Sequence, residues 1–297
     1  MTRRGGSIGT SRRHGSKPAN ERPALPVPVA AANGQPGRLL LLILLVCAWA
    51  ASWPVMKIGV ASVGPLWFGS LRYLVASVLL LTIAAARGEL AWPARQDRQL
   101  ILISGATQMA GFSALSGAAL TILPPGRAAV LAYSTPLWVA PLAAWRLAEP
   151  LSRRAILGLG LGLAGIALLV APSLRADRFP FIMADLMLLG AAGLWAISIV
   201  YVRTHRFIAT PLALAPWQTL FATALLCPLA YLTAGAPPPI DRTAALTLAY
   251  AGPVATAFAY WAMVAIGRHF SATTISTALL ITPSLGALFS AVILHGG

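Results

Sequence analysis

The stretch Arg38-Leu-Leu-Leu-Leu-Ile-Leu-Leu-Val-Cys-Ala-Trp-Ala-Ala-Ser-Trp-Pro-Val-Met-Lys-Ile-Gly-Val60 decides the fold class of this chain. After its first residue it contains a single charged side chain, that of Lys57. The hydrocarbon core of a bilayer is about 30 Å thick, and an α-helix needs about 20 predominantly apolar residues to cross it. The stretch therefore predicts a helix that spans a membrane.

The rest of the chain repeats this pattern. Of its 297 residues, 58% are hydrophobic and only 10% are charged, which is too apolar a composition for a water-soluble domain. Polar and Pro- or Gly-containing connections divide the chain into nine apolar segments. The predicted fold is an all-α, polytopic transmembrane helix bundle with spans at residues 38–60, 65–86, 99–122, 126–147, 153–171, 180–202, 211–233, 243–266 and 272–294.

The positive charges indicate an orientation. The formal net charge is +15, but the basic residues lie between the spans and in one tail and make no nucleic-acid-binding face. Residues 1–37, rich in Gly, Pro, Ser and Arg, predict a disordered basic tail. With that tail in the cytoplasm, 16 of the 22 Lys and Arg residues fall on the cytoplasmic side and five on the other. We expect an inner-membrane protein whose partner is the lipid bilayer and whose C-terminus lies outside.

No catalytic or metal-binding pattern is present in the sequence. Cys47 and Cys227 lie in different spans, and the four histidines share no ligand spacing. There is no phosphate-binding GxxxxGK[ST] loop and no nucleophile with a matching base at membrane depth. The sequence therefore predicts neither an enzyme nor a cofactor.

The two halves of the chain resemble each other. At an offset of 146 residues, Trp49 aligns with Trp195, and at an offset of 147, Pro136 aligns with Pro283. Matching prolines within spans are less easily accidental than matching alanines. Because five spans is an odd number, a second copy would cross the membrane in the opposite sense. The pattern predicts two inverted repeats, residues 38–171 with five spans and residues 180–297 with four.

Several short motifs identify a family resemblance. They are Trp49-Ala-Ala-Ser-Trp-Pro-Val-Met-Lys57, Leu71-Arg-Tyr-Leu74, Pro124-Pro-Gly-Arg-Ala-Ala129, Tyr133-Ser-Thr-Pro136 and Glu149-Pro-Leu-Ser152. In combination they resemble the EamA-type members of the drug/metabolite transporter superfamily. The resemblance implies ten spans in two five-helix repeats, and export or exchange of small metabolites, commonly amino acids or related solutes.

The sequence departs from the family pattern at its end. At the offset of 147, Glu149-Pro150 falls on Gly296-Gly297, so a second Glu-Pro motif and a tenth span do not follow. Two interpretations stay open: a carrier of nine spans, or a truncated membrane protein without transport activity, either a sensor or a remnant.

Three charged residues within or near spans are candidates for function. Arg72 lies in the second span, where it either neutralises a carboxylate substrate or is held structurally by backbone carbonyls. Lys57, near the outer end of the first span, either anchors the helix at the interface or contacts substrate. Asp185 either couples transport to protons or complements the dipole at the start of its helix.

Other candidates are uncharged. Trp49, Trp53 and Trp195 either line a substrate cavity or pack between helices. The same alternatives, substrate binding or interhelical hydrogen bonding, apply to the polar residues Gln108, Tyr133, Gln218, Tyr260 and Thr282. Gating or loop-structure roles are assigned to Lys57, Pro136, Glu149 and Pro283.

Together these features predict a secondary carrier that moves a small-molecule substrate by alternating access, with energy from a gradient or from exchange. The sequence specifies neither the substrate nor the oligomeric state.

Overall fold

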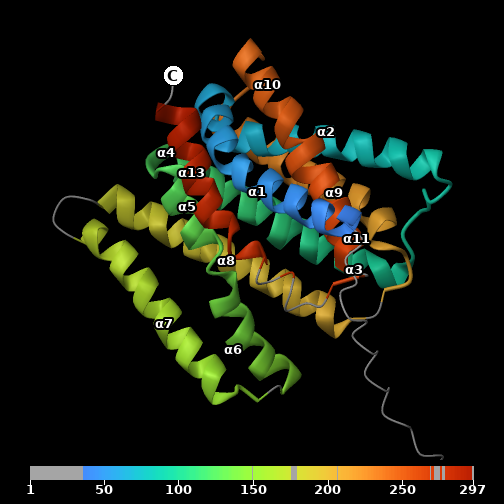
Figure 1. Cartoon of the computed structure of the whole chain (residues 1–297). Coiled ribbons are helices and arrows are strands. Elements are labelled where there is room, and N and C mark those ends of the chain that lie inside the picture. Colours follow the sequence, from blue (N-terminus) through green and yellow to red (C-terminus); the bar gives the residue numbers. More distant parts are fainter. Residues whose placement is uncertain are drawn as a thin grey trace, which may run out of the picture. The chain divides into compact units, whose positions relative to one another are not determined.

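The structure, a computed structural model, describes residues 36–148, 150–174, 179–205, 207–267, 269–270, 275 and 278–295. All regular elements in these ranges are helices (Figure 1), so the predicted all-α bundle is confirmed. Residues 1–35, which make up nearly all of the predicted tail, lie outside the described residues, as does Glu149.

The first half of the chain begins with a helical hairpin. Gly64 alone separates α1 (Pro36–Val63) from α2 (Pro65–Ala86), and its φ of 80° is a conformation that glycine adopts without strain. Pro65 then begins α2, at a position where the missing N–H is not needed. The other elements of this half are α3 (Arg95–Ser104), the π-helix η1 (Gly105–Gly111), α4 (Phe112–Ile122), α5 (Pro125–Ala132), α6 (Thr135–Leu147), α7 (Arg153–Val170) and the 3₁₀ turn η2 (Ala171–Leu174).

The second half follows the same order of elements. The side chain of Thr210 caps the first turn of its second helix, and Pro211 again occupies the first helical position. The elements of this half are α8 (Phe179–Thr204), α9 (Pro211–Ala234), α10 (Arg242–Ala251), the π-helix η3 (Pro253–Phe258), α11 (Ala259–Gly267) and α13 (Thr282–His295).

Seven helical segments within the described residues are long and apolar enough to cross a membrane, and they correspond to the first seven predicted spans. The eighth predicted span is shared by α10, η3 and α11, and all of α13 except its last residue, His295, lies within the ninth. The fourth span differs from the prediction of one kinked helix. It is broken at Tyr133 and Ser134, and Pro136 lies in the first turn of the new helix α6.

The repeat register reappears in the structure. α3 and α10 each begin and end at residues 147 apart, and the two π-helices that follow them begin within one residue of this spacing. Both α6 and α13 begin at a Thr-Pro pair, also 147 residues apart. A π-helix is rare, and here one follows the third helix of each half at a spacing of 148 residues.

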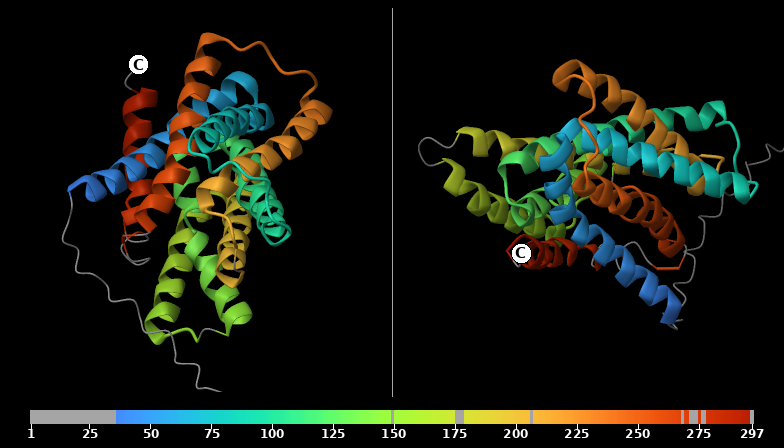
Figure 2. Two further views of the ribbon diagram at one scale, coloured as in Figure 1. Left: turned by 90° about the vertical axis from the view of Figure 1, so that its right-hand side faces the viewer. Right: turned by 90° about the horizontal axis from the view of Figure 1, so that it is seen from above.

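Helices of the two halves interleave. α2 packs along α9, α1 along α13, and α4 along α8, so each of these contacts joins one half to the other. Figure 2 shows the same arrangement in two further views, with blue-to-green helices lying between orange-to-red ones. The interior therefore forms between the halves, and a rearrangement of one half against the other would change it.

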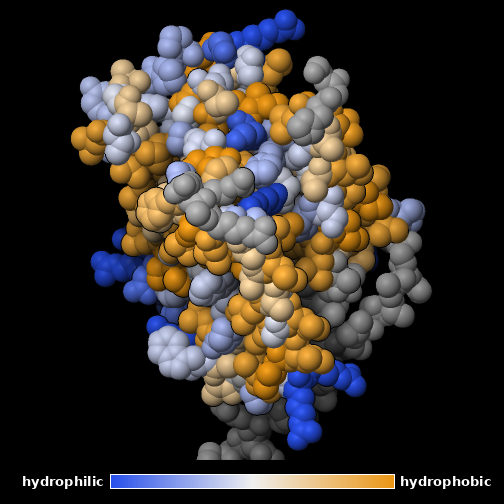
Figure 3. All heavy atoms as spheres, turned by 90° about the vertical axis from the view of Figure 1, so that its left-hand side faces the viewer, coloured by the Kyte–Doolittle hydropathy of each residue, from blue (hydrophilic) through white to orange (hydrophobic). Residues whose placement is uncertain are grey.

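α7 is the exception to this close packing. None of its residues is buried, and Leu157, Leu161 and Leu168 are each about two-thirds exposed or more. Such a helix is stable in a bilayer because its backbone hydrogen bonds are internal and lipid tails cover its side chains. On the face shown in Figure 3, apolar side chains cover broad areas of the surface in the same way.

The α1–α2 hairpin depends on a close approach at Gly59. A Cβ atom added there would collide with the ring of Phe68, which is 1% exposed and cannot move outward. We therefore expect Gly59→Ala to destabilise the protein by about 1–3 kcal/mol, the usual effect of overpacking. Thermal unfolding of the purified protein in detergent measures it.

Gly158 on α7 provides the matched control, because a Cβ there meets no atom within 4 Å. Gly158→Ala should leave the melting temperature unchanged or raise it slightly through helix propensity. Equal melting temperatures for both variants would show that the hairpin does not need this contact.

Candidate functional site

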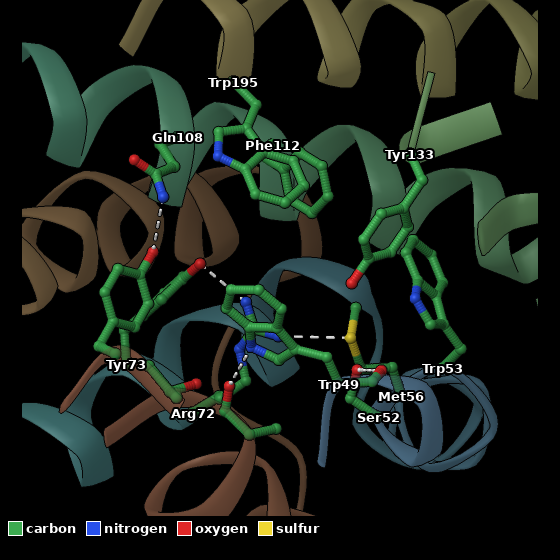
Figure 4. Close-up of a pocket in the computed structure, with 13 residues that line it drawn as sticks. Trp49, Ser52, Trp53, Met56, Arg72, Tyr73, Gln108, Phe112, Tyr133 and Trp195 are labelled. Atoms are coloured by element: carbon green, nitrogen blue, oxygen red, sulfur yellow. Dashed lines mark hydrogen bonds between the residues drawn. The ribbon is translucent and has the colours of Figure 1, made fainter. Parts of the chain in front are cut away.

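A small cavity lies between the two halves. Its volume is about 80 Å³, well below the roughly 300–1,000 Å³ of sites for drug-sized ligands. Side chains of the first half come from α1, α2, η1, α4 and the break between α5 and α6, and those of the second half come from α8, η3 and α11 (Figure 4). The lining residues are Trp49, Ser52, Trp53, Met56, Arg72, Tyr73, Gln108, Phe112, Tyr133, Trp195, Ala255, Thr256 and Tyr260.

Both π-helices contribute to this cavity. Gln108 lies in η1, and Ala255 and Thr256 lie in η3. The indole N–H of Trp49 donates to the carbonyl oxygen of Ala255 at 3.3 Å, which connects α1 to the second half. Wide π-turns are frequent at functional sites because they displace side chains from ordinary helical positions.

Aromatic rings form one wall of the cavity. The ring of Trp195 makes edge contacts with Trp49, Phe112 and Tyr133, with centroid distances of 6.4, 5.4 and 5.9 Å. Trp53 packs against Tyr133 at 6.4 Å. Figure 4 shows these rings facing the same space. They come from α1, α4, α8 and the α5–α6 break, so the wall spans both halves.

A polar chain leads away from the cavity. The amide nitrogen of Gln108 donates to the hydroxyl of Tyr260 at 3.3 Å, and its amide oxygen accepts from Ser198 at 2.9 Å. Ser198 lies 2.8 Å from the hydroxyl of Ser104, and both serines are buried. Hydrogen bonds satisfy these buried groups, as an apolar environment requires, and they join η1 to α8 and α11.

Arg72 provides the charge of the cavity. It lies in α2 and is 7% exposed. One terminal nitrogen donates to Tyr73 at 2.8 Å and to Ser113 at 3.3 Å, and the other contacts the sulfur of Met56 at 3.3 Å. The guanidinium carbon also lies 4.6 Å from the centre of the Tyr73 ring.

The structure brings seven of the nine predicted cavity residues together. Trp49, Trp53, Arg72, Gln108, Tyr133, Trp195 and Tyr260 all line the cavity. Gln218 does not; it is half-buried on α9, and its backbone lies against Gly105 at the start of η1. Thr282, fully buried at the start of α13, is not a lining residue either, although its side chain lies beside that of Tyr133, which is one.

The remaining lining residues are ones that were not selected from the sequence. Tyr73 follows Arg72 directly in the sequence. Ser52 and Met56 share a helical face with Trp49 and Trp53. The sequence therefore gave a reason to select these three positions. Phe112 lies four residues after Gln108. The sequence gave no such reason for Ala255 and Thr256, because their place in the wall depends on the π-helix.

Lys57 caps a helix. Its ammonium group donates to the carbonyl oxygens of Leu120, Thr121 and Leu123, which are among the last of α4 and lack helical partners. A cation suits this end of a helix dipole. Among the roles predicted for Lys57, this geometry matches a role in loop structure. Anchoring at the membrane interface alone would not account for the hydrogen bonds to the end of α4.

Asp185 is paired with Arg127. The guanidinium donates to the two carboxylate oxygens at 3.0 and 2.5 Å, and to the hydroxyl of Ser173 at 2.6 Å. The Asp185 side chain is 1% exposed. Neither of the two roles considered for Asp185 included this buried ion pair, which joins α5, α8 and η2. The sequence placed Arg127 at the start of the fourth predicted span and Asp185 near the start of the sixth, and it gave no sign of the pair.

These features define the class of protein: a multi-pass, α-helical membrane protein with a polar cavity enclosed between two similar halves. Within the described residues, no three His, Cys, Asp or Glu side chains come together in a possible metal site.

Comparisons with known proteins give the family. The sequence model of the EamA-like transporter family matches residues 37–171 and, a second time, residues 182–296. This chain belongs to the EamA-like transporter family, and the resemblance found in its motifs is confirmed. Its role is accordingly that of a membrane transporter.

Individual relatives are distant. The "uncharacterized transporter YoaV" of Bacillus subtilis is 23% identical over 86% of this chain and 88% of its own length. A "probable amino-acid metabolite efflux pump" of Salmonella typhimurium is 26% identical over 86% of both chains. The match to another Bacillus subtilis protein, "uncharacterized transporter YvbV", is 28% identical and spans about half of either chain, 55% of this one and 53% of YvbV. One solved crystal structure shares the fold, with a TM-score of 0.60, 21% identity and 88% coverage of both chains.

The buried ion pair can be tested by its effect on stability. Asp185→Asn preserves shape but leaves Arg127 without a counter-charge, and removal of one partner of a buried pair costs about 3–5 kcal/mol. We expect a marked fall in melting temperature for Asp185→Asn and for Arg127→Met.

The double variant Arg127→Met/Asp185→Asn should lose less stability than the two single variants added together, because neither charge is then left unpaired. Arg87→Met, at an exposed position after α2, is the control. Additive losses in the double variant would rule out a stabilising interaction between the two residues.

Proposed function

We propose that the protein is a secondary carrier that exports or exchanges a small metabolite across the inner membrane by alternating access. The cavity carries the proposal, because side chains of both halves line it and it lies at membrane depth. In carriers built from inverted repeats, a site between the repeats opens to one side and then to the other as the halves rock. The relatives named as amino-acid metabolite efflux pumps support export of an amino acid or a related solute.

Two reciprocal contacts between the halves support this movement. Asp97, in the first turn of α3, accepts hydrogen bonds from the backbone N–H groups of Ile208 and Ala209 at 2.9 and 3.2 Å. Asp241, which caps α10, accepts from the hydroxyl of Ser62 at 3.0 Å. Residues 62 and 208 are 146 apart, so the last turn of α1 in one half, and the loop after α8 in the other, each meet the start of the third span of the opposite half.

The two contacts differ in burial. Asp97 is completely buried, whereas Asp241 is exposed to solvent. The N–H of Ala244 and the hydroxyl of Ser62 hold the pKa of Asp241 below its ordinary value, so it is ionised at neutral pH, and its contribution is lost only as the pH falls through that lowered pKa. The side of the α8–α9 loop is therefore the more firmly closed. In the proposed orientation, with the N-terminus inside, this is the cytoplasmic side.

Labelling of a cysteine in the cavity would test the two contacts. In a variant without Cys47 and Cys227, Ser52→Cys places a thiol in the cavity lining. Asp97→Ala leaves two loop N–H groups without their acceptor, and we expect it to raise the rate of labelling by an impermeant reagent added on the side of the α8–α9 loop.

Asp241→Ala is the matched control and should not raise labelling from that side. If both variants label like their parent protein, Asp97 does not hold the cavity closed.

Transport itself can be measured in proteoliposomes. We expect counterflow of one or more amino acids or related metabolites from a labelled panel, without ATP. Trp195→Ala removes three ring contacts in the cavity wall, each of about 0.5–1.5 kcal/mol, and should slow the flux about tenfold.

Trp92→Ala is the control, because Trp92 is 74% exposed and does not line the cavity. The absence of flux for every solute, with protein shown to be inserted, would favour the alternative of a membrane protein that does not transport.

A further inference from the structure

The guanidinium of Arg72 lies in the cavity wall, and no anionic side chain among the described residues contacts it. Its hydrogen-bond acceptors are the hydroxyls of Tyr73 and Ser113 and the sulfur of Met56. Its Nε is buried and has no hydrogen-bond partner within the described residues. Three of its five N–H donors therefore face neutral or weak acceptors, and the one on Nε faces none.

The described acidic residues are all engaged elsewhere. Glu89 accepts from Thr210 at 3.1 Å on one surface, and Asp241 accepts from Ser62 on another. Asp97 accepts from the backbone of the α8–α9 loop, and Asp185 is paired with Arg127. The lining of the cavity contains no Asp or Glu. The part of the chain that the structure describes thus offers Arg72 no counter-charge.

Burying the charge of Arg72 in this way is unfavourable in free energy unless an anion enters the cavity. An arginine stays charged at any physiological pH, so it cannot relieve its burial by losing a proton. Removing an ion from water costs several kcal/mol, and neutral hydroxyls return only part of this. A carboxylate would complete the shell, because the guanidinium and carboxylate groups form short, charge-assisted hydrogen bonds.

The opposite wall of the cavity indicates the chemistry and size of the rest of the ligand. Trp49, Phe112, Tyr133 and Trp195 present ring surfaces to the space (Figure 4), which suit an apolar body. The volume of about 80 Å³ favours a body of few carbon atoms. A ring face also tolerates an ammonium group, although no carboxylate is present to bind one.

We propose that Arg72 binds the carboxylate of the transported molecule, so that the substrate is a small organic carboxylate with an apolar body. The inference rests on the proposed function, because it assumes that the cavity is the transport site. A zwitterionic amino acid and a simple carboxylate both supply this chemistry, and matched ligands distinguish them.

Four compounds that share one branched alkyl chain test the proposal. L-Leucine carries both charged groups, 4-methylpentanoate lacks the amine, leucinamide lacks the carboxylate charge, and 3-methylbutylamine lacks the carboxyl group. Their affinities for the purified full chain are measured by quenching of tryptophan fluorescence, since three tryptophans line the cavity. We expect the two carboxylates to bind about 10- to 100-fold more tightly than the amide and the amine, the range typical of hydrogen bonds to a charged group.

Variants of Arg72 connect this preference to one side chain. Arg72→Gln should bring the affinities of all four compounds to within about threefold of one another. Arg72→Lys keeps the charge, and should retain a weakened preference even if the Gln variant does not fold. Arg98→Gln is the control, because Arg98 is exposed and its side chain donates to the carbonyl oxygen of Pro93, away from the cavity lining.

The outcomes separate the inference from the proposed function. Binding of carboxylates that depends on Arg72, without flux, would support the site and contradict the carrier. Flux with equal or tighter binding of the amide and the amine would support the carrier and overturn the site. If 4-methylpentanoate binds as well as leucine, the ligand needs only the carboxylate; if leucine alone binds, it is an amino acid. Binding of none of the four compounds to the folded protein overturns the proposal.

Discussion

Polar groups within a bilayer must find their partners inside the protein, and most of this structure follows from that constraint. An exposed polar group has no water to bind there, so backbone N–H and C=O groups lie in helices or are bound by a neighbour. The helix ends show the consequence most clearly. Lys57 occupies the carbonyls at the end of α4, and Asp97 occupies the N–H groups of a loop in the opposite half. Charged side chains, which are unfavourable in contact with lipid, here connect one segment of the protein to another.

The sequence was informative where one residue type determines the local structure. Long apolar runs located the first seven spans, and the matched positions of Pro136 and Pro283 predicted the register in which α6 and α13 both begin. Seven of the nine candidate cavity residues could also be chosen in advance, because a polar or aromatic side chain in the middle of a span has few other places to point.

The sequence was uninformative where position depends on partners distant in the chain. Arg127 and Asp185 are 58 residues apart and each follows a connection, so nothing local indicates that they meet. Lys57 has an unremarkable place in its helix, and its role depends on where α4 ends. The π-helices were not predicted, because periodicity describes the regular helix and not its exceptions.

The π-helices have a consequence for what sequence changes the fold can accept. A π-turn holds about one residue more than an α-turn, and each residue of a regular helix turns the chain by about 100°. The wide turn of η1 therefore absorbs its extra residue locally. Deletion of one residue there would restore an ordinary helix and leave α4 close to its present orientation, so that Phe112 and Ser113 would stay in place. Gln108 itself would move, because it lies within the wide turn, and its hydrogen bonds to Tyr260 and Ser198 would be lost. The helices around the cavity thus accept a change of length in η1, but the groups that η1 places in the cavity do not.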